Sequence, residues 1–145
     1  MEKAILDAFE ASLARCNADP RFLDLFYDKF LASSPKVREK FARTDFVHQK
    51  RALRGSFHLM LLAADNERRD PERYLRDLAA QHGKRQMDIT ADLYDVWLDS
   101  LVETVREIDP EFGPAVEDAW ERVMMVGIHY MLSHYDDPPR LTIYD

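Results

Sequence analysis

The apolar residues of this 145-residue chain recur at steps of three and four positions along almost its whole length, and period-two alternation is absent. A period between three and four is the repeat of an α-helix that buries one face. The chain has only 4 glycines, and its 7 prolines are spread out, which disfavours sheet-rich or linker-rich architectures. The pattern therefore predicts an all-α protein.

Helix-breaking and capping residues divide the chain into about seven helices of unequal length. Many unequal helices favour packing at steep crossing angles over a simple up-down bundle. We expect one domain over residues 1–135 and an irregular C-terminal tail over 136–145, where two adjacent prolines forbid a helix. The predicted helices cover approximately residues 2–16, 20–33, 35–41, 46–64, 71–82, 91–108 and 114–135.

Charge and cysteine content exclude several classes of function. Acidic residues outnumber basic ones by 27 to 20, so the formal net charge of −7 would repel nucleic acids and anionic membrane surfaces. The only cysteine is Cys16, which excludes an intrachain disulfide and a multi-cysteine zinc site. No apolar run approaches the roughly 20 residues of a membrane span, and the N-terminus lacks the plan of a signal peptide. We expect a cytoplasmic protein with no nucleic-acid partner and no membrane insertion.

Three predicted helices carry a polar side chain where the apolar stripe calls for an apolar one. These side chains are Tyr27, Gln49 and His82. Helical spacing makes each of them face inward together with its apolar neighbours. The neighbours are Leu23 and Leu31 for the tyrosine, Phe46, Leu53, Phe57 and Met60 for the glutamine, and Leu75 and Leu78 for the histidine.

Each polar side chain has an ordinary structural explanation. Tyr27 can be a core residue with a satisfied hydroxyl, Gln49 can reach water from a helix start, and His82 can bond a backbone carbonyl. However, an unpaired buried polar group costs about 1–3 kcal/mol, and three such groups on inward faces suggest a shared cavity with polar contents. A planar metal cofactor would satisfy all three, with the imidazole on iron and the other two donating to a bound diatomic molecule.

Five short segments, in order along the chain, resemble the bacterial globins, specifically their single-domain and flavohaemoglobin branch. The resemblance covers roughly residues 20–135 and implies a globin fold of about seven helices around a haem pocket. The segments are FYDKFL (26–31), SPKVREKF (34–41), HQKRAL (48–53), LAAQH (78–82) and DAWERV (118–123).

The resemblance also implies haem b, iron protoporphyrin IX, as the cofactor. It makes His82 the proximal iron ligand, and it places Tyr27 and Gln49 on the distal side, where they would hold a gas ligand. Phe41 corresponds to the phenylalanine that packs on the haem, and Leu53 follows the distal glutamine by one turn. The full set of haem-contacting residues implied by the resemblance is Phe41, Leu53, Leu78, His82, Tyr94 and Trp97.

Two departures from the family pattern bear on the chemistry. The family often backs its proximal histidine with a tyrosine and a glutamate of the final helix. Tyr94 would be that tyrosine, but it lies two residues farther from His82 than expected, and residues 127–135 contain no carboxylate. A carboxylate partner makes an axial imidazole more electron-donating, so its absence weakens a peroxidase-like interpretation. The chain length leaves no room for a flavin reductase domain, so any redox cycle would need an external reductase.

The other histidines are weaker candidates for iron ligation. His48 either turns to solvent or swings into the pocket as a sixth ligand, whereas His58, His129 and His134 are expected at the surface or in the core. The basic segment 84–86 either approaches haem propionates or is a solvated helix end.

We therefore predict a haem b globin that binds dioxygen reversibly and also binds NO and CO, as a monomer or homodimer. Oxygen transport, oxygen sensing and NO detoxification are all open roles. An NO dioxygenase activity would need a separate reductase, and otherwise the protein would be a non-enzymatic oxygen carrier. The alternative is a haem-free globin-fold sensor or protein-interaction module, which would give a colourless preparation.

Overall fold

The computed structural model describes residues 1–66 and 69–137, and within these ranges it contains seven α-helices and no strand. The prediction of an all-α chain is confirmed, and every predicted helix has a counterpart. The helices are α1 (Lys3–Asn17), α2 (Phe22–Ser33), α3 (Pro35–Lys40), α4 (Phe46–Asp65), α5 (Glu72–His82), α6 (Ala91–Ile108) and α7 (Pro114–Ser133). Most of the predicted tail, residues 138–145, lies outside the described ranges.

The predicted start of the second helix at Pro20 is wrong. Pro20 lies in a turn, and α2 begins only at Phe22. The carboxylate of Asp19 accepts the backbone N–H of Arg21 at 2.9 Å and also its guanidinium group at 2.8 Å. This local bonding holds residues 18–21 as a turn, which competes with the helix that the proline would otherwise begin.

Other helix starts follow the capping chemistry of the sequence. The side chain of Ser34 accepts the N–H of Lys36 at 3.2 Å, with Pro35 in the first helical position. Asp45 accepts the N–H of Val47 at 3.1 Å and begins α4 in the same way. These caps set the residue at which α3 and α4 begin, and therefore which of their side chains face the interior.

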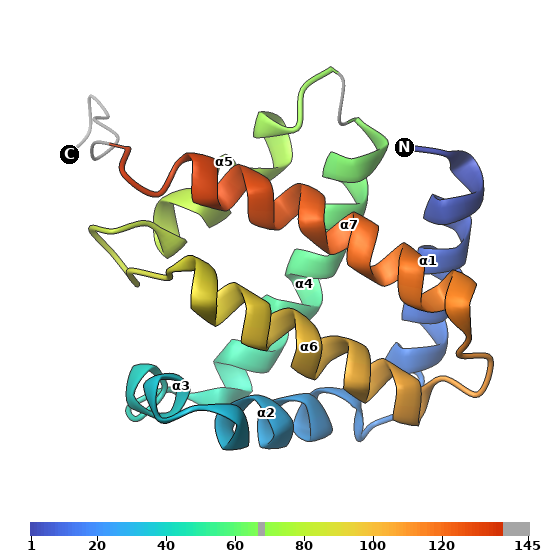
Figure 1. Cartoon of the computed structure of the whole chain (residues 1–145), viewed down its shortest axis with the longest axis horizontal. Helices are drawn as coiled ribbons and strands as arrows, with labels where there is room; N and C mark the ends of the chain where they lie inside the picture. Colours follow the sequence, from blue (N-terminus) through green and yellow to red (C-terminus); the bar gives the residue numbers. More distant parts are fainter. Residues whose placement is uncertain (67–68, 138–145) are drawn as a thin grey trace.

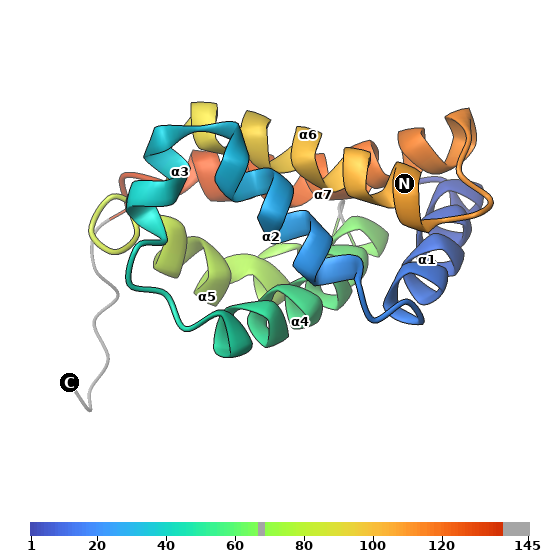
Figure 2. The ribbon, with the colours of Figure 1, turned by 90° about the horizontal axis from the view of Figure 1, so that it is seen from below.

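The helices pack in crossed pairs (Figure 1). Helix α2 packs against α6, α1 packs against α7, and α4 packs against both α5 and α7. Seen from below, α6 and α7 lie on one side of the molecule, and α4 and α5 lie on the other (Figure 2).

A cluster of aromatic side chains around Trp120 joins four of the helices. Its ring centroid lies 4.7 Å from that of Phe9, 6.2 Å from that of Phe22 and 5.6 Å from that of Phe57. The indole N–H donates to the hydroxyl of Ser12 at 2.8 Å, so the one polar atom of the ring is satisfied. This cluster of fully buried rings is a closely packed part of the core.

Helices α4 and α7 approach each other closely at Gly127. A Cβ atom added there would lie only 3.2 Å from Cγ of Met60. Glycine therefore permits this close helix contact, and a larger residue would require the Met60 side chain to shift by a few tenths of an ångström.

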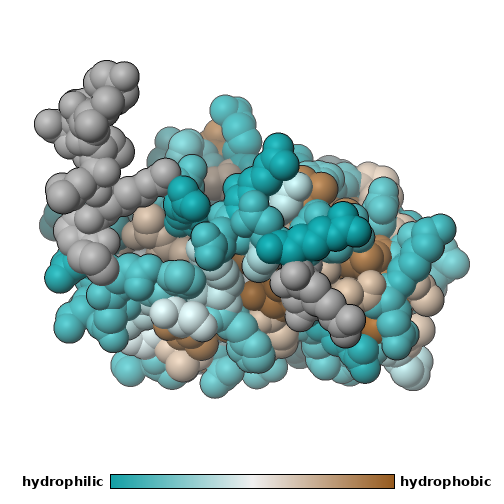
Figure 3. Space-filling view, turned by 90° about the horizontal axis from the view of Figure 1, so that it is seen from above, coloured by the Kyte–Doolittle hydropathy of each residue, from teal (hydrophilic) through white to brown (hydrophobic). Residues whose placement is uncertain are grey.

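The surface seen from above is mostly hydrophilic, with small apolar areas interrupted by polar side chains (Figure 3). Among the described residues, no helix combines the length and the apolar character needed to cross a membrane.

Candidate cofactor cavity

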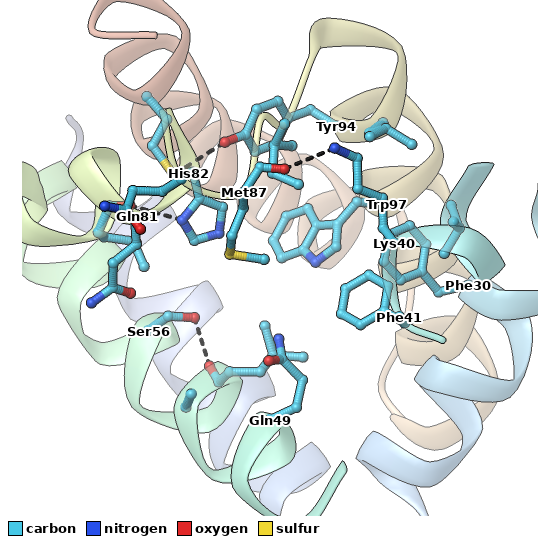
Figure 4. A pocket seen from close by; sticks show the side chains of 18 of the residues that line it. Phe30, Lys40, Phe41, Gln49, Ser56, Gln81, His82, Met87, Tyr94 and Trp97 are labelled. Carbon is cyan, nitrogen blue, oxygen red and sulfur yellow. Dashed lines mark hydrogen bonds between the residues drawn. The ribbon is translucent and has the colours of Figure 1, made fainter. Parts of the chain in front are cut away.

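A cavity of about 350 Å³ lies between the two sides of the molecule, and its walls come from α2 to α7 (Figure 4). Every residue singled out from the sequence as a site residue lines it. Those residues are Tyr27, Phe41, Gln49, Leu53, Leu78, His82, Tyr94 and Trp97. The structure therefore brings together side chains that are up to 70 positions apart in the sequence.

His82 is the last residue of α5, and its ring reaches into the cavity (Figure 4). Its Nδ1 atom lies 2.7 Å from the carbonyl oxygen of Leu78, one turn earlier. Because a carbonyl can only accept a hydrogen bond, Nδ1 carries the proton and Nε2 keeps a free lone pair. Both interpretations of the sequence are thus compatible, since the carbonyl bond occupies one nitrogen and leaves the other to act as a ligand.

Electrostatics favour the neutral form of this imidazole. Burial lowers the pKa of His82 below its ordinary value, and the hydrogen bond to Leu78 opposes the shift only in part. A neutral imidazole with a free lone pair is the form that ligates a metal.

The loop that follows His82 is held in place from two directions. The N–H of Ile89 donates to the carbonyl of His82 at 3.0 Å, which closes the loop onto the end of α5. The amino group of Lys40 donates to the carbonyls of Met87 and Asp88 at 2.8 and 2.9 Å. These bonds connect the loop to the end of α3, so the histidine sits on a braced segment.

Tyr94 packs beside the imidazole of His82, but its hydroxyl forms a hydrogen bond with a different residue. Its ring is stacked on that of His82, with centroids 6.4 Å apart and an angle of 24° between the planes. Its hydroxyl donates to the sulfur of Met131 at 3.5 Å, and burial raises its pKa. The hydroxyl partner of Tyr94 is therefore a methionine sulfur, and the hydrogen-bond partner of His82 is a neutral carbonyl.

Tyr27 and Gln49 line a different wall from His82, and Figure 4 shows Gln49 across the cavity from the histidine. Tyr27 is 4% exposed, and burial raises its pKa to about 12, although an interaction with the Gln49 side chain acts in the opposite direction. The phenol therefore keeps its proton at neutral pH and is available as a hydrogen-bond donor.

Flat aromatic rings form a third wall. The ring of Phe41 lies 6.1 Å from that of Tyr27 and 5.7 Å from that of Phe30. Trp97 lines the same cavity and is supported from behind by Phe26 at 6.2 Å. Apolar planes of this kind suit a flat, largely apolar guest.

Several lining residues were not found from the sequence. Lys40, Met87 and Met131 contribute to the cavity wall. Lys40 is exposed and Met87 lies in a loop, so neither falls on an apolar helical face that periodicity could detect. Met131 carries such a signal, because it lies on the buried face of α7, but an apolar residue there looks like ordinary core.

The other four histidines and the residues of segment 84–86 differ in whether they line the cavity. His48 is exposed and lines the cavity, whereas His58, His129 and His134 are not among the lining residues. In the segment 84–86, only Gln86 lines the cavity.

The donor set fits an iron porphyrin. A neutral imidazole offers one axial lone pair, flat rings flank the space, and a hydroxyl and an amide are available on other walls. Among the described residues, no group of three or more His, Cys, Asp or Glu side chains could hold a metal ion by itself. A metal at His82 would therefore need further ligands from a cofactor such as a porphyrin.

Comparison with known proteins agrees with this geometry. The family model for globins matches residues 24–131. A crystal structure of protein PA3967 from Pseudomonas aeruginosa PAO1, described as structurally highly homologous to a human haemoglobin, is 40% identical. It superposes with a TM-score of 0.84 over 90% of this chain and 98% of that one. No curated protein matches the chain.

The chain is a member of the globin family, and its fold is the globin fold. The narrower assignment to the flavohaemoglobin-like branch stays a prediction.

Proposed function

We propose that this globin binds haem b in the cavity and uses it to bind small diatomic gases reversibly, namely dioxygen, NO and CO. The observation that carries the proposal is the state of His82, whose Nδ1 is bonded to the Leu78 carbonyl and whose Nε2 is free in the cavity. His82 would hold the haem iron, and the iron would supply reversible coordination of a diatomic gas.

Different residues of the protein have different roles in the proposed site. His82 would hold the haem iron through the lone pair of Nε2, and the hydrogen-bonded loop that follows it keeps the ring directed into the cavity. Phe41, Leu53 and Trp97 would pack against the porphyrin and exclude water from it. Tyr27 and Gln49 would donate hydrogen bonds to a polar diatomic ligand held in the cavity and would stabilise partial negative charge on it.

The neutral partner of His82 supports reversible binding over peroxidase-type chemistry. A carboxylate partner would strengthen electron donation from the imidazole, whereas the carbonyl of Leu78 does so only weakly. Oxygen delivery, oxygen sensing and NO detoxification with an external reductase all begin with the same binding step, so each role is compatible with this site.

A titration with haemin tests the proposal. We expect the purified protein to take up one equivalent of haemin and to show an intense Soret band, which shifts when the reduced protein is exposed to CO. A protein that remains colourless, and leaves the spectrum of free haemin unchanged, would support the haem-free sensor or interaction module instead.

A further inference from the structure

The outer face of α4 carries an apolar stripe that no other described helix covers. The stripe consists of Ala52, Gly55, Leu59 and Leu62, all of which are exposed. Leu59 is 37% exposed and Leu62 is 42% exposed, which makes them two of the few large apolar side chains at the surface. Figure 2 shows α4 along one edge of the molecule, with no helix outside it. We call these four residues the α4 stripe.

We propose that the α4 stripe is the contact surface of a homodimer in which the α4 helices of two copies pack antiparallel. The stripe alternates steps of three and four residues, which is the spacing of a helix that packs against another helix. It is too narrow and too short to serve as a membrane anchor, because it spans fewer than four turns.

Side-chain size is complementary in the antiparallel arrangement. With the twofold axis midway between Gly55 and Leu59, Ala52 faces Leu62 of the second copy, and Gly55 faces Leu59. Each large side chain thus meets a small one. A Cβ atom added at Gly55 would have no neighbour within 4 Å, so the space above this glycine is open to receive a leucine.

Charge is complementary in the same arrangement. Arg51 and Asp65 flank the stripe on one side, about four helical turns apart, and both are exposed. Neither forms an ion pair with another described residue. In the antiparallel dimer, each Arg51 meets Asp65 of the other copy, which gives two symmetric ion pairs. A parallel twofold arrangement would put the two charged flanks on opposite edges of the interface, where Arg51 and Asp65 could not pair.

The proposed contact reaches the edge of the cavity. Ala52 belongs to the α4 stripe and also lines the cavity, as does the neighbouring His48. Leu62 of the second copy would therefore lie beside the cavity wall formed by α4. The dimer itself depends only on the surface of α4 and not on haem binding, so the two proposals can fail independently.

Sedimentation velocity on the full chain, from about 10 µM to about 1 mM, measures the association. A single pair of helices is a small interface, so we expect a reversible dimer with a dissociation constant on the order of 100 µM. A sedimentation coefficient that stays at the monomer value over the whole range would overturn the proposal.

Charge reversal tests the arrangement. Arg51→Glu and Asp65→Arg alone should each weaken the dimer about tenfold, because each change replaces two attractive pairs by two repulsive ones. The double variant should recover to within about threefold of wild type. The control Arg106→Glu makes the same charge change on α6, on the other side of the molecule from α4, and should alter the dissociation constant less than about twofold. Failure of the double variant to recover would overturn the antiparallel pairing.

Disulfide trapping gives a second readout, which reports the register of the contact. The native Cys16 is 0% exposed and will not compete. A mixture of Gly55→Cys and Leu59→Cys proteins should form a disulfide-linked heterodimer faster than either protein alone forms a homodimer, because residues 55 and 59 face each other across the axis. Equal rates in all three samples would contradict this register.

Discussion

The Nδ1 atom of His82 lies 2.7 Å from the carbonyl oxygen of Leu78, one turn earlier on α5. This bond fixes the tautomer and the orientation of the imidazole, and it does so with a neutral partner. Tyr94 lies beside the ring, but its hydroxyl is directed to the sulfur of Met131. The predicted chemistry of the pocket, reversible gas binding, depends on this uncharged environment.

Replacing Tyr27 with Phe should speed dioxygen dissociation far more than CO dissociation. The change removes one hydroxyl and little volume, so packing is nearly preserved. The lost hydrogen bond should be worth about 1–3 kcal/mol, or roughly one to two decades in rate. CO carries less negative charge on its outer atom and should respond weakly. Stopped-flow rates for both gases decide the matter, and equal changes for the two would indicate altered access instead of a lost hydrogen bond.

Replacing Gln49 with Leu should act in the same direction as the tyrosine change. If both side chains donate to one ligand, the effects of the two substitutions on the dioxygen dissociation rate should not add in the double variant. The same stopped-flow experiment on Gln49→Leu and on the double variant checks this. Independent, additive effects would mean that the two donors do not share a ligand.

Lys40→Met should accelerate haem loss. The amino group of Lys40 braces the loop after His82 through the carbonyls of Met87 and Asp88, and hydrogen bonds from a charged donor are worth about 1.5–3 kcal/mol each in favourable settings. We expect haem transfer to an acceptor globin to be about tenfold faster. The control is Lys36→Met on the same helix, which breaks only an exposed pair with Asp92. Equal rates of haem transfer from the two variants would show that the Lys40 hydrogen bonds to the loop do not help to retain haem.

Asp109 should be the most important carboxylate for stability. It is 3% exposed and accepts hydrogen bonds from Ser12 at 2.6 Å and from Arg15 at 2.6 and 2.9 Å. Asp109→Asn should lower the free energy of unfolding by about 2–3 kcal/mol in urea denaturation. Asp118→Asn, which breaks an exposed pair with Arg122, should cost less than about 1 kcal/mol. Similar losses for the two variants would contradict the assignment.

The contribution of Asp109 should disappear in acid. Burial alone would raise the pKa of Asp109, but hydrogen bonds from Arg15 and Ser12 outweigh it and lower the pKa below its ordinary value. The unfolded chain therefore binds the proton more readily, so the stabilisation is complete above the unfolded pKa of about 4 and is lost as pH falls through the folded value. The stability difference between wild type and Asp109→Asn should be constant from about pH 7 to pH 5 and shrink below about pH 4. A difference that shrank already between pH 7 and pH 5 would contradict this.

Local sequence patterns predicted the helices and the residues on inward faces. Tyr27, Gln49 and His82 were detectable because each is polar at an apolar helical position, and all three line one cavity. Lys40 was not detectable, because its role depends on a loop 47 and 48 positions away that periodicity cannot place. The start of α2 was misplaced because Asp19 bonds Arg21 and holds Pro20 in a turn.

The hydrogen-bond partner of Tyr94 is a second feature that the sequence alone could not predict. The resemblance to bacterial globins brought an expectation of a tyrosine and a carboxylate behind the histidine, and the sequence already lacked the carboxylate. Only the packing of α6 against α7 reveals that Met131 receives the hydroxyl instead. Contacts between distant helices decide such partners, and they are set by the fold as a whole.

The most direct test of the central claim is the low-frequency resonance Raman spectrum of the reduced protein reconstituted with haem. We predict an iron–imidazole stretching band that is absent from His82→Gly and returns when free imidazole is added to that variant. Its frequency should lie in the range of a neutral imidazole rather than that of a strongly hydrogen-bonded, imidazolate-like one. An unchanged band in His82→Gly without added imidazole would show that His82 is not the iron ligand.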